Sequence, residues 1–379
     1  MDLQFTTLGA LIGLVIAILL IIKKVQPAYG LILGALIGGL IGGGGLAGTV
    51  STMVSGAGSM MSSVLRILTS GILAGALIKT GAAQKIAETI VDTIGEKRAI
   101  AALAVATMII CAVGVFIDIA VITVAPIALA IGERAGLSKS GILLAMIGGG
   151  KAGNIVSPNP NTIAVTEAFK LDLTAVMMIP ALCALIATIV LASLLAKKAG
   201  DGISQNDLEA TPAEKLPNAL QAFAGPLTVI VLLALRPLAK ISVDPLIALP
   251  LGGLVCILVT GNIRNLIPYT DFGLSKVIGV AILLIGTGTI AGIIKASALQ
   301  KDMTALLSAM NMPAFILAPL SGILMAAATA STTAGSTVAS QTFSGTLLAA
   351  GVPALSAAAM IHAGATVLDS LPHGSFFHA

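Results

Sequence analysis

This sequence has little charge. Only 9% of its 379 residues are Asp, Glu, Lys or Arg, whereas roughly a quarter are charged in an ordinary soluble domain. The net charge of +4 is spread thinly over the loops, which is not the pattern of a nucleic-acid-binding protein. By contrast, 57% of the residues are hydrophobic, and apolar stretches of about 20 residues, long enough to cross a lipid bilayer, recur along the chain. The composition therefore predicts an all-α, polytopic membrane protein.

Residue types that support chemistry are also scarce. The three cysteines lie in apolar runs without metal-binding or disulfide spacing, so we expect buried thiols at Cys111, Cys183 and Cys256. The three histidines form no HExxH motif, and the sequence has no P-loop, GxGxxG or GxSxG signature. We therefore expect neither enzymatic activity, nor a cofactor, nor a metal site.

The apolar segments define the expected membrane helices. The first, Leu8–Ile22, is followed by two lysines and has no small-residue cleavage site, so we expect a transmembrane helix and not a signal peptide. We place the glycine run Gly42–Gly45 inside a membrane helix, where glycine permits close packing. Two segments, Ala82–Ile94 and Ala298–Met310, carry charges on one face and predict interfacial helices. The long apolar segment Ala99–Ile131 exceeds a single crossing.

The sequence contains an internal repeat. Pro27 opens "PAYGLILGALIGGLI" and Pro245 opens the similar "PLIALPLGGLVCILV". The stretch "ILAGALIKTGAAQK" recurs later as "TIAGIIKASALQK", and "AMI" recurs at the matching place in each half. We therefore divide the chain into a first repeat (1–161), a linker with one membrane helix and a polar loop (162–221), and a second repeat (222–379).

The positive charges predict that the two repeats have opposite orientations. Lys23, Lys24 and Lys79 follow helices of the first repeat and would be cytoplasmic if the N-terminus is outside. The second-repeat equivalents, Lys295 and Lys301, then lie outside with fewer positive neighbours. Such asymmetry is typical of inverted-topology repeats, in which broken helices and re-entrant hairpins at matching positions form the substrate site of a transporter.

Two pairs of polar interruptions fit that pattern. One pair consists of "GVFIDIAVITVAP" (114–126) and the Ser/Thr-rich "TASTTAGST" (329–337). The other pair consists of the hairpin tips "GNIVSPNPN" (153–161) and "DSLPHGSFFH" (369–378). An unpaired backbone amide or carbonyl costs several kcal/mol in lipid, so a break survives only where it is packed in protein or lines a cavity.

The interruptions supply the candidate site residues. Asp118, an ionisable group at membrane depth, could carry a coupling proton, or it could be a structural acid hydrogen-bonded near a helix end. The first tip could bind an anion through its amides and helix end, or it could be a simple re-entrant turn. In the second tip Asp369 could assist the proton transfer and His373 could bind substrate, whereas we expect His362 to be a packed helix residue and Arg66 to extend to a membrane edge. The candidate substrate-binding residues are Lys151, Asn154, Ser157, Asn159, Asn161, Thr162, Ser331, Thr332, Thr333 and His373.

The chain resembles the gluconate:proton symporter (gluconate permease) family of the ion transporter superfamily. The resemblance rests on "GILAGALIKTGAAQKIAETI" (71–90), "FIDIAVITVAPIAL" (116–129), the proline-rich tip and "ATASTTAG" (328–335). The family's acid in the broken helix corresponds to Asp118, and its Val-x-Asp motif corresponds to Val367–Asp369. The resemblance implies a multi-pass protein of the bacterial inner membrane, a homodimer, and proton-driven uptake of sugar acids.

Two departures from the family pattern affect these expectations. Gluconate permeases carry a histidine flanked by prolines where this chain has "SPNPN", so glycerate, other aldonates and hydroxybutyrate-like acids stay open as substrates. The family also continues through further membrane segments beyond the position of Ala379, so we expect the second repeat to be truncated. The alternatives are a sodium-coupled dicarboxylate carrier and a cation/proton antiporter, because hydroxyls, amides and carbonyls can also hold sodium. A membrane-embedded enzyme or a structural assembly partner has no supporting motif.

Overall fold

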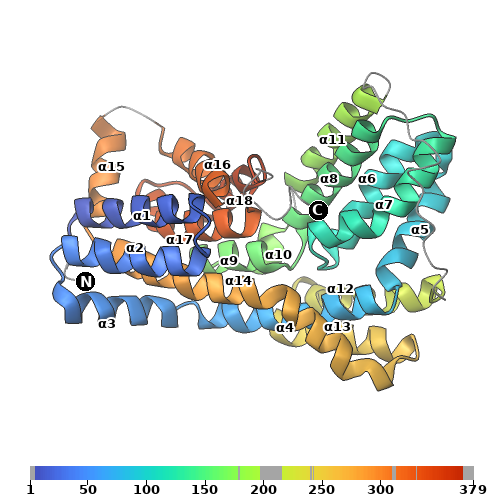
Figure 1. The fold of residues 1–379 in the computed structure, drawn as a ribbon, viewed down its shortest axis with the longest axis horizontal. Helices are drawn as coiled ribbons and strands as arrows, with labels where there is room; N and C mark the ends of the chain where they lie inside the picture. Colours follow the sequence, from blue (N-terminus) through green and yellow to red (C-terminus); the bar gives the residue numbers. More distant parts are fainter. Residues whose placement is uncertain are drawn as a thin grey trace. The chain divides into compact units, whose positions relative to one another are not determined.

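A computed structural model of the chain describes residues 5–177, 180–196, 216–239, 241, 243–309, 313–329 and 331–369. Across these ranges the regular elements are helices, and extended pairing is confined to one isolated bridge between Phe5 and Ser297. The all-α fold class predicted from the composition is confirmed. Figure 1 shows the helices in chain order from blue to red.

The first half of the chain forms eleven of the described helices. They are α1 (Thr7–Ile22), α2 (Pro27–Ile41), α3 (Gly45–Gly58), α4 (Met61–Lys79), α5 (Ala82–Ile94), α6 (Ala99–Ala112), α7 (Ile117–Arg134), α8 (Lys139–Val156), α9 (Pro160–Phe169), α10 (Leu173–Val176) and α11 (Pro180–Ala196). The later helices are α12 (Ala219–Ala239), α13 (Pro245–Val259), α14 (Leu266–Lys295), α15 (Leu299–Ala309), α16 (Leu317–Thr329), α17 (Thr332–Ala349) and α18 (Ala354–Ala365).

The repeated sequence produces matched helix starts. Both α2 and α13 have 15 residues and begin with proline at the first helical position, where the missing amide hydrogen is not needed. In each case the preceding side chain caps the helix: Gln26 accepts a hydrogen bond from the Tyr29 amide, and Asp244 accepts one from the Leu246 amide. Helices also form in the two segments predicted to be interfacial, one as α5 with the expected bounds and one as α15, and their position relative to a membrane stays a prediction.

The prediction for the glycine run is wrong. Instead of continuing one helix, Gly42, Gly43 and Gly44 form the turn between α2 and α3, and Gly45 is the first residue of α3. Gly43 and Gly45 adopt φ angles of +92° and +63°. Side chains other than glycine rarely adopt this left-handed region, so the glycines permit the turn.

Two helices of the described part are long and apolar enough to cross a membrane: Met61–Lys79, with 19 residues, and Ile263–Lys295, with 33 residues. At 1.5 Å per residue, the shorter one is roughly 28 Å long, close to the thickness of a bilayer core. The apolar helices of 10–17 residues include α1, α2, α6 and α13. Large aliphatic side chains such as Leu8, Val15 and Leu19 of α1 are exposed, as expected for a surface in contact with lipid.

The helices form two compact units that differ from the sequence repeats. The first unit comprises Met1–Ile67, Pro160–Val176 and Ile278–Ala379, and the second comprises Leu68–Asn159 and Met177–Val277. Each unit therefore takes helices from both halves of the chain: α1 to α3 join α15 to α18 in the first, and α5 to α8 join α12 and α13 in the second. The predicted division into two repeats and a linker describes a duplication of the sequence. The two spatial units do not test it, so it stays a prediction.

Candidate substrate site

Helices are broken at both polar interruptions of the first pair, 114–126 and 329–337. In the first, α6 ends at Ala112 and α7 begins at Ile117, with Gly114 at φ +105° between them. In the second, α16 ends at Thr329 and α17 begins at Thr332, where the Ser331 hydroxyl caps the new helix by accepting a hydrogen bond from the Ala334 amide at 3.3 Å. The two helices that follow the breaks, α7 and α17, each have 18 residues.

Each of these helix starts has a carboxylate. Asp118 is the second residue of α7, half-buried within its first turn. Thr333 occupies the same position in α17, but the neighbouring Thr332 hydroxyl donates a hydrogen bond to the carboxylate of Asp369, which is 4% exposed. Because a helix N-terminus carries a partial positive charge, it stabilises an anion at either position. Each break therefore has a predicted coupling residue at its helix start: Asp118 belongs to α7 itself, and Asp369 reaches α17 through Thr332.

The start of α7 packs against α8. The Ile117 side chain lies directly against Gly150, and Gly153 lies against the backbone of Met108 and the side chain of Cys111. Within the second unit, the contact between Ile117 and Gly150 brings the first turn of α7 to the stretch of α8 that carries Lys151, whose side chain is half-buried, while Gly153 packs against α6.

The first tip interrupts the helix at the predicted place. The backbone of Ser157 is extended after α8, and Pro160 begins α9. The Asn159 amide donates to the Asn154 carbonyl at 3.1 Å and also to the Asn154 side-chain oxygen. These hydrogen bonds between Asn154 and Asn159 are the ones expected if the tip is a simple re-entrant turn. The hydroxyl of Ser157 is fully buried and has no hydrogen-bond partner among the described residues.

Beyond the tip, α9 carries Asn161 and Thr162 into the first unit, where it packs against α17 and α18 (Figure 1). Asn161 Nδ2 lies 2.7 Å from His362 Nε2, and each residue is 1% exposed. When the amide donates, Nε2 is the acceptor and the neutral imidazole carries its hydrogen on Nδ1. His362 Nδ1 has no hydrogen-bond partner in the described part of the chain. The structure thus gives His362 a specific partner in addition to helix packing, while His373 lies outside the described residues.

Sequence reasoning missed most of the polar surface of α17. The polar interruption was predicted to end at Thr337 and the candidate substrate-binding residues in it at Thr333, but the buried polar residues continue along the helix. The signal was available, because no other apolar segment of this chain has such a density of hydroxyl side chains. Thr337 Oγ1 and Thr342 Oγ1 have no hydrogen-bond partner within the ranges that the structure describes. The additional buried residues are Ser336, Thr337, Ser340, Gln341, Thr342, Ser344 and Thr346.

Three helices of the first unit, α9, α17 and α18, therefore form a polar assembly, which we call the three-helix site. It combines buried hydroxyls and amides, one imidazole and one carboxylate. Buried polar atoms are normally paired, and leaving one unpaired costs about 1–3 kcal/mol. Three unpaired atoms, Thr337 Oγ1, Thr342 Oγ1 and His362 Nδ1, lie on the packed helices α17 and α18, and a hydrogen-bonding ligand would satisfy such atoms. Within the described ranges, no group of three His, Cys, Asp or Glu side chains could hold a metal ion.

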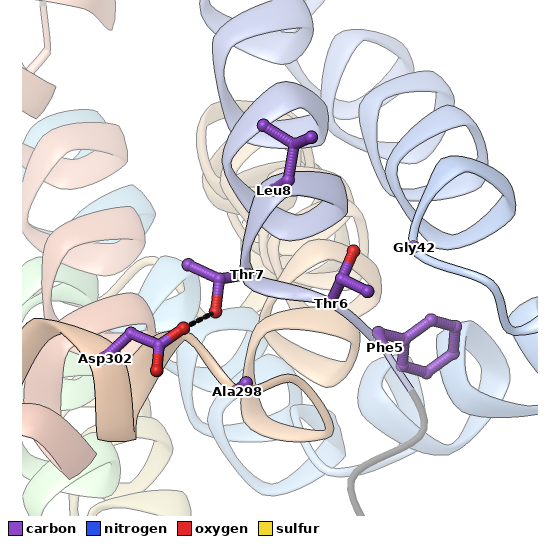
Figure 2. A pocket seen from close by; sticks show the side chains of 7 residues that line it. All are labelled: Phe5, Thr6, Thr7, Leu8, Gly42, Ala298 and Asp302. Atoms are coloured by element: carbon purple, nitrogen blue, oxygen red, sulfur yellow. Dashed lines mark hydrogen bonds between the residues drawn. The ribbon is translucent and has the colours of Figure 1, made fainter.

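A separate pocket of about 460 Å³ lies near the start of α1 and contains no predicted site residue. Figure 2 shows Thr7 and Asp302 pointing toward one another, and the Thr7 hydroxyl donates a hydrogen bond to the Asp302 carboxylate. The bridge between Phe5 and the start of α15 lies beside it, with the Ala298 amide donating to the Phe5 carbonyl at 3.1 Å. These bonds attach the N-terminal segment to α15. The pocket is lined by Phe5, Thr6, Thr7, Leu8, Gly42, Ala298 and Asp302.

Broken helices with buried polar ends, set among apolar helices, define a membrane transporter. The model of the GntP family permeases matches residues 5–252. The chain belongs to this family, so it is a permease and not an enzyme.

Relatives of known sequence agree with this assignment. An uncharacterized transporter of Haemophilus influenzae is 57% identical over 377 residues, covering 99% of this chain and 90% of that protein. The inner membrane permease YgbN of Escherichia coli is 32% identical over 174 residues, covering 43% of this chain and 37% of that protein. The YdaH transporter of Alcanivorax borkumensis, whose crystal structure has an unusual topology, shares the fold with a TM-score of 0.55 at 15% identity, over 87% of this chain and 78% of that one.

Proposed function

We propose that this permease is a secondary active transporter that takes up gluconate-like sugar acids or small hydroxycarboxylates such as glycerate, driven by a proton gradient across the bacterial inner membrane. The observation that carries the proposal is the three-helix site, with its unpaired buried groups at Thr337, Thr342 and His362. A polyhydroxylated acid offers several donors and acceptors in one small molecule, and it would satisfy such groups simultaneously. A purely apolar solute would leave them unpaired.

The remaining predicted residues have complementary roles in this proposal. Asn161, Thr162, Ser331, Thr332 and Thr333 supply amide and hydroxyl groups around the two helix starts. Lys151, Asn154, Ser157 and Asn159 belong to the second unit and stay predicted substrate contacts, with Lys151 as the candidate counter-charge. His373 stays a predicted contact outside the described residues.

Asp118 and Asp369 are the proposed proton carriers. Each carboxylate is located at the start of a broken helix, where its charge is stabilised when the proton leaves. Uptake of an anion together with at least one proton reduces the charge that must cross the membrane. The same combination of carboxylate and hydroxyl oxygens suits a hard cation, so sodium coupling is the second candidate.

Uptake into sealed vesicles tests the proposal. Purified protein is reconstituted, and labelled gluconate and labelled glycerate are offered with either a proton gradient or a sodium gradient. We expect accumulation with the proton gradient, and we expect a protonophore to abolish it. Accumulation with sodium alone would transfer the coupling role to sodium. Absence of uptake of both acids under both gradients would contradict the proposed substrate class.

A further inference from the structure

An ion pair connects α4 to α9 within the first unit. Arg66 lies in α4, one of the two described helices that are long and apolar enough to cross a membrane, and its guanidinium pairs with the carboxylate of Glu167 near the end of α9. One turn earlier on α4, the Ser62 hydroxyl donates to the same carboxylate at 3.3 Å. This arrangement differs from the expected extension of Arg66 to a membrane edge, because the guanidinium has a specific acidic partner.

The pair is partly removed from solvent. The side chains of Arg66 and Glu167 are 24% and 32% exposed. Charged residues in membrane helices are costly, and they usually face the protein interior and pair with one another. Removing one member then weakens the compensation of the other member's charge in a poorly solvated place. The pairing of two partly buried opposite charges therefore indicates a structural role for the ion pair.

The length and the contacts of α9 indicate what the ion pair does. At about 15 Å, the ten-residue helix is too short to cross a bilayer, so its position depends on side contacts. Asn161 near its start bonds to His362 of α18, and Glu167 near its end bonds to α4. The helix therefore has polar contacts near both ends, and these are directed to different neighbours.

We propose that Glu167 is a positioning residue: its pairing with Arg66 and Ser62 fixes the rotation and axial position of α9, and thereby keeps Asn161 on His362 in the three-helix site. The inference rests on the proposed function, because it assigns the geometry of that site to a contact outside it. The ion pair does not touch the substrate in this scheme. The ion pair should therefore position α9 equally well when the positive charge is on α9 and the negative charge is on α4.

Disulfide cross-linking measures this geometry without any substrate. Asn161→Cys and His362→Cys are introduced into a chain whose Cys111, Cys183 and Cys256 are replaced by alanine, and the rate of oxidant-driven cross-linking is followed in proteoliposomes. We expect Glu167→Gln to slow cross-linking by about tenfold, because a loosened α9 spends less time in register. The charge-swapped pair Arg66→Glu with Glu167→Arg should restore most of the rate.

The matched control is Glu88→Gln, which removes the acidic partner of Lys85 from the i,i+3 pair on α5 and should leave the rate unchanged. Cross-linking at the parent rate in Glu167→Gln would overturn the proposal. The proposal would also be overturned if Glu167→Gln cross-links slowly and the charge-swapped pair cross-links no faster. That result would mean that Glu167 acts through its shape or packing and not through its charge.

Hydrogen exchange provides a second test that needs no engineered cysteine. In Glu167→Gln, amides of residues 161–169 should exchange at least about tenfold faster than in the unmodified protein, while those of α5 stay the same. Equal exchange in both proteins would refute the positioning role. Because neither test uses a transported solute, their failure is distinguishable from failure of the proposed function, which is read from vesicle uptake alone.

Discussion

Substitution of Asn161 by leucine tests the central contact of the three-helix site. The change keeps the approximate volume but removes the amide that lies 2.7 Å from His362 Nε2. Both residues are 1% exposed, so water cannot replace the lost partner. Since His362 Nδ1 already has no partner among the described residues, the whole imidazole would then be unpaired.

The expected cost follows from the burial of the imidazole. Leaving a buried acceptor unpaired costs about 1–3 kcal/mol in the free energy of unfolding, and we expect the upper half of this range because the His362 environment is fully enclosed. Replacing His362 as well, by phenylalanine, removes the orphaned group. The double variant should therefore recover at least about 1 kcal/mol relative to Asn161→Leu.

The assay is unfolding in detergent, with vesicle uptake measured in parallel. Thr49→Val is the control, because Thr49 is also fully buried but its hydroxyl has no partner in the described structure, so its removal should be neutral or stabilising. Uptake should fall by at least about tenfold in both the single Asn161 variant and the double variant, because the double variant regains stability but not the polar groups. Unchanged stability of Asn161→Leu would refute the pairing, and full uptake by the double variant would refute the site.

The remaining predictions concern three other positions. Asp118→Asn should abolish proton-driven accumulation and spare solute exchange, as measured with labelled solute on both sides of the vesicle; wild-type accumulation would remove Asp118 from the coupling role. Lys170→Gly should stabilise the protein by about 1 kcal/mol in thermal unfolding, because the Lys170 backbone has a φ of +52° that glycine adopts without strain; a loss of stability would show that the lysine side chain compensates. Gly153→Val should destabilise by about 1–3 kcal/mol or prevent accumulation of folded protein, because this glycine touches α6, whereas Gly48→Ala on α3, with open space around it, should be neutral; equal behaviour of the two variants would contradict the packing.

Much of the fold follows from local patterns in the sequence. The proline and polar cap that open α2 and α13, and the charge pattern of α5, depend on neighbours a few residues away, so the sequence predicts them well. The glycine run at 42–45 shows the limit of this reasoning. Glycine serves close helix packing and tight turns equally, and the local sequence does not say which one is used.

The candidate site was only partly predictable for a related reason. Asp118 and the first tip stand out as polar groups in apolar surroundings, and sequence alone identifies them. His362 looked like an ordinary helix residue because its partner, Asn161, is far away in the chain. Asp369 likewise reaches the start of α17 through a long-range hydrogen bond with Thr332.

The sequence by itself determined that this protein is an all-α membrane permease with helices interrupted at matching places. Hydrophobicity, helix breakers and capping groups act over a few residues, so they can be read along the chain. Only the tertiary structure decided which interruptions share a unit, which buried hydroxyls stay unpaired, and that Arg66 meets Glu167. These features depend on contacts between residues distant in sequence, and such contacts exist only once the helices have packed.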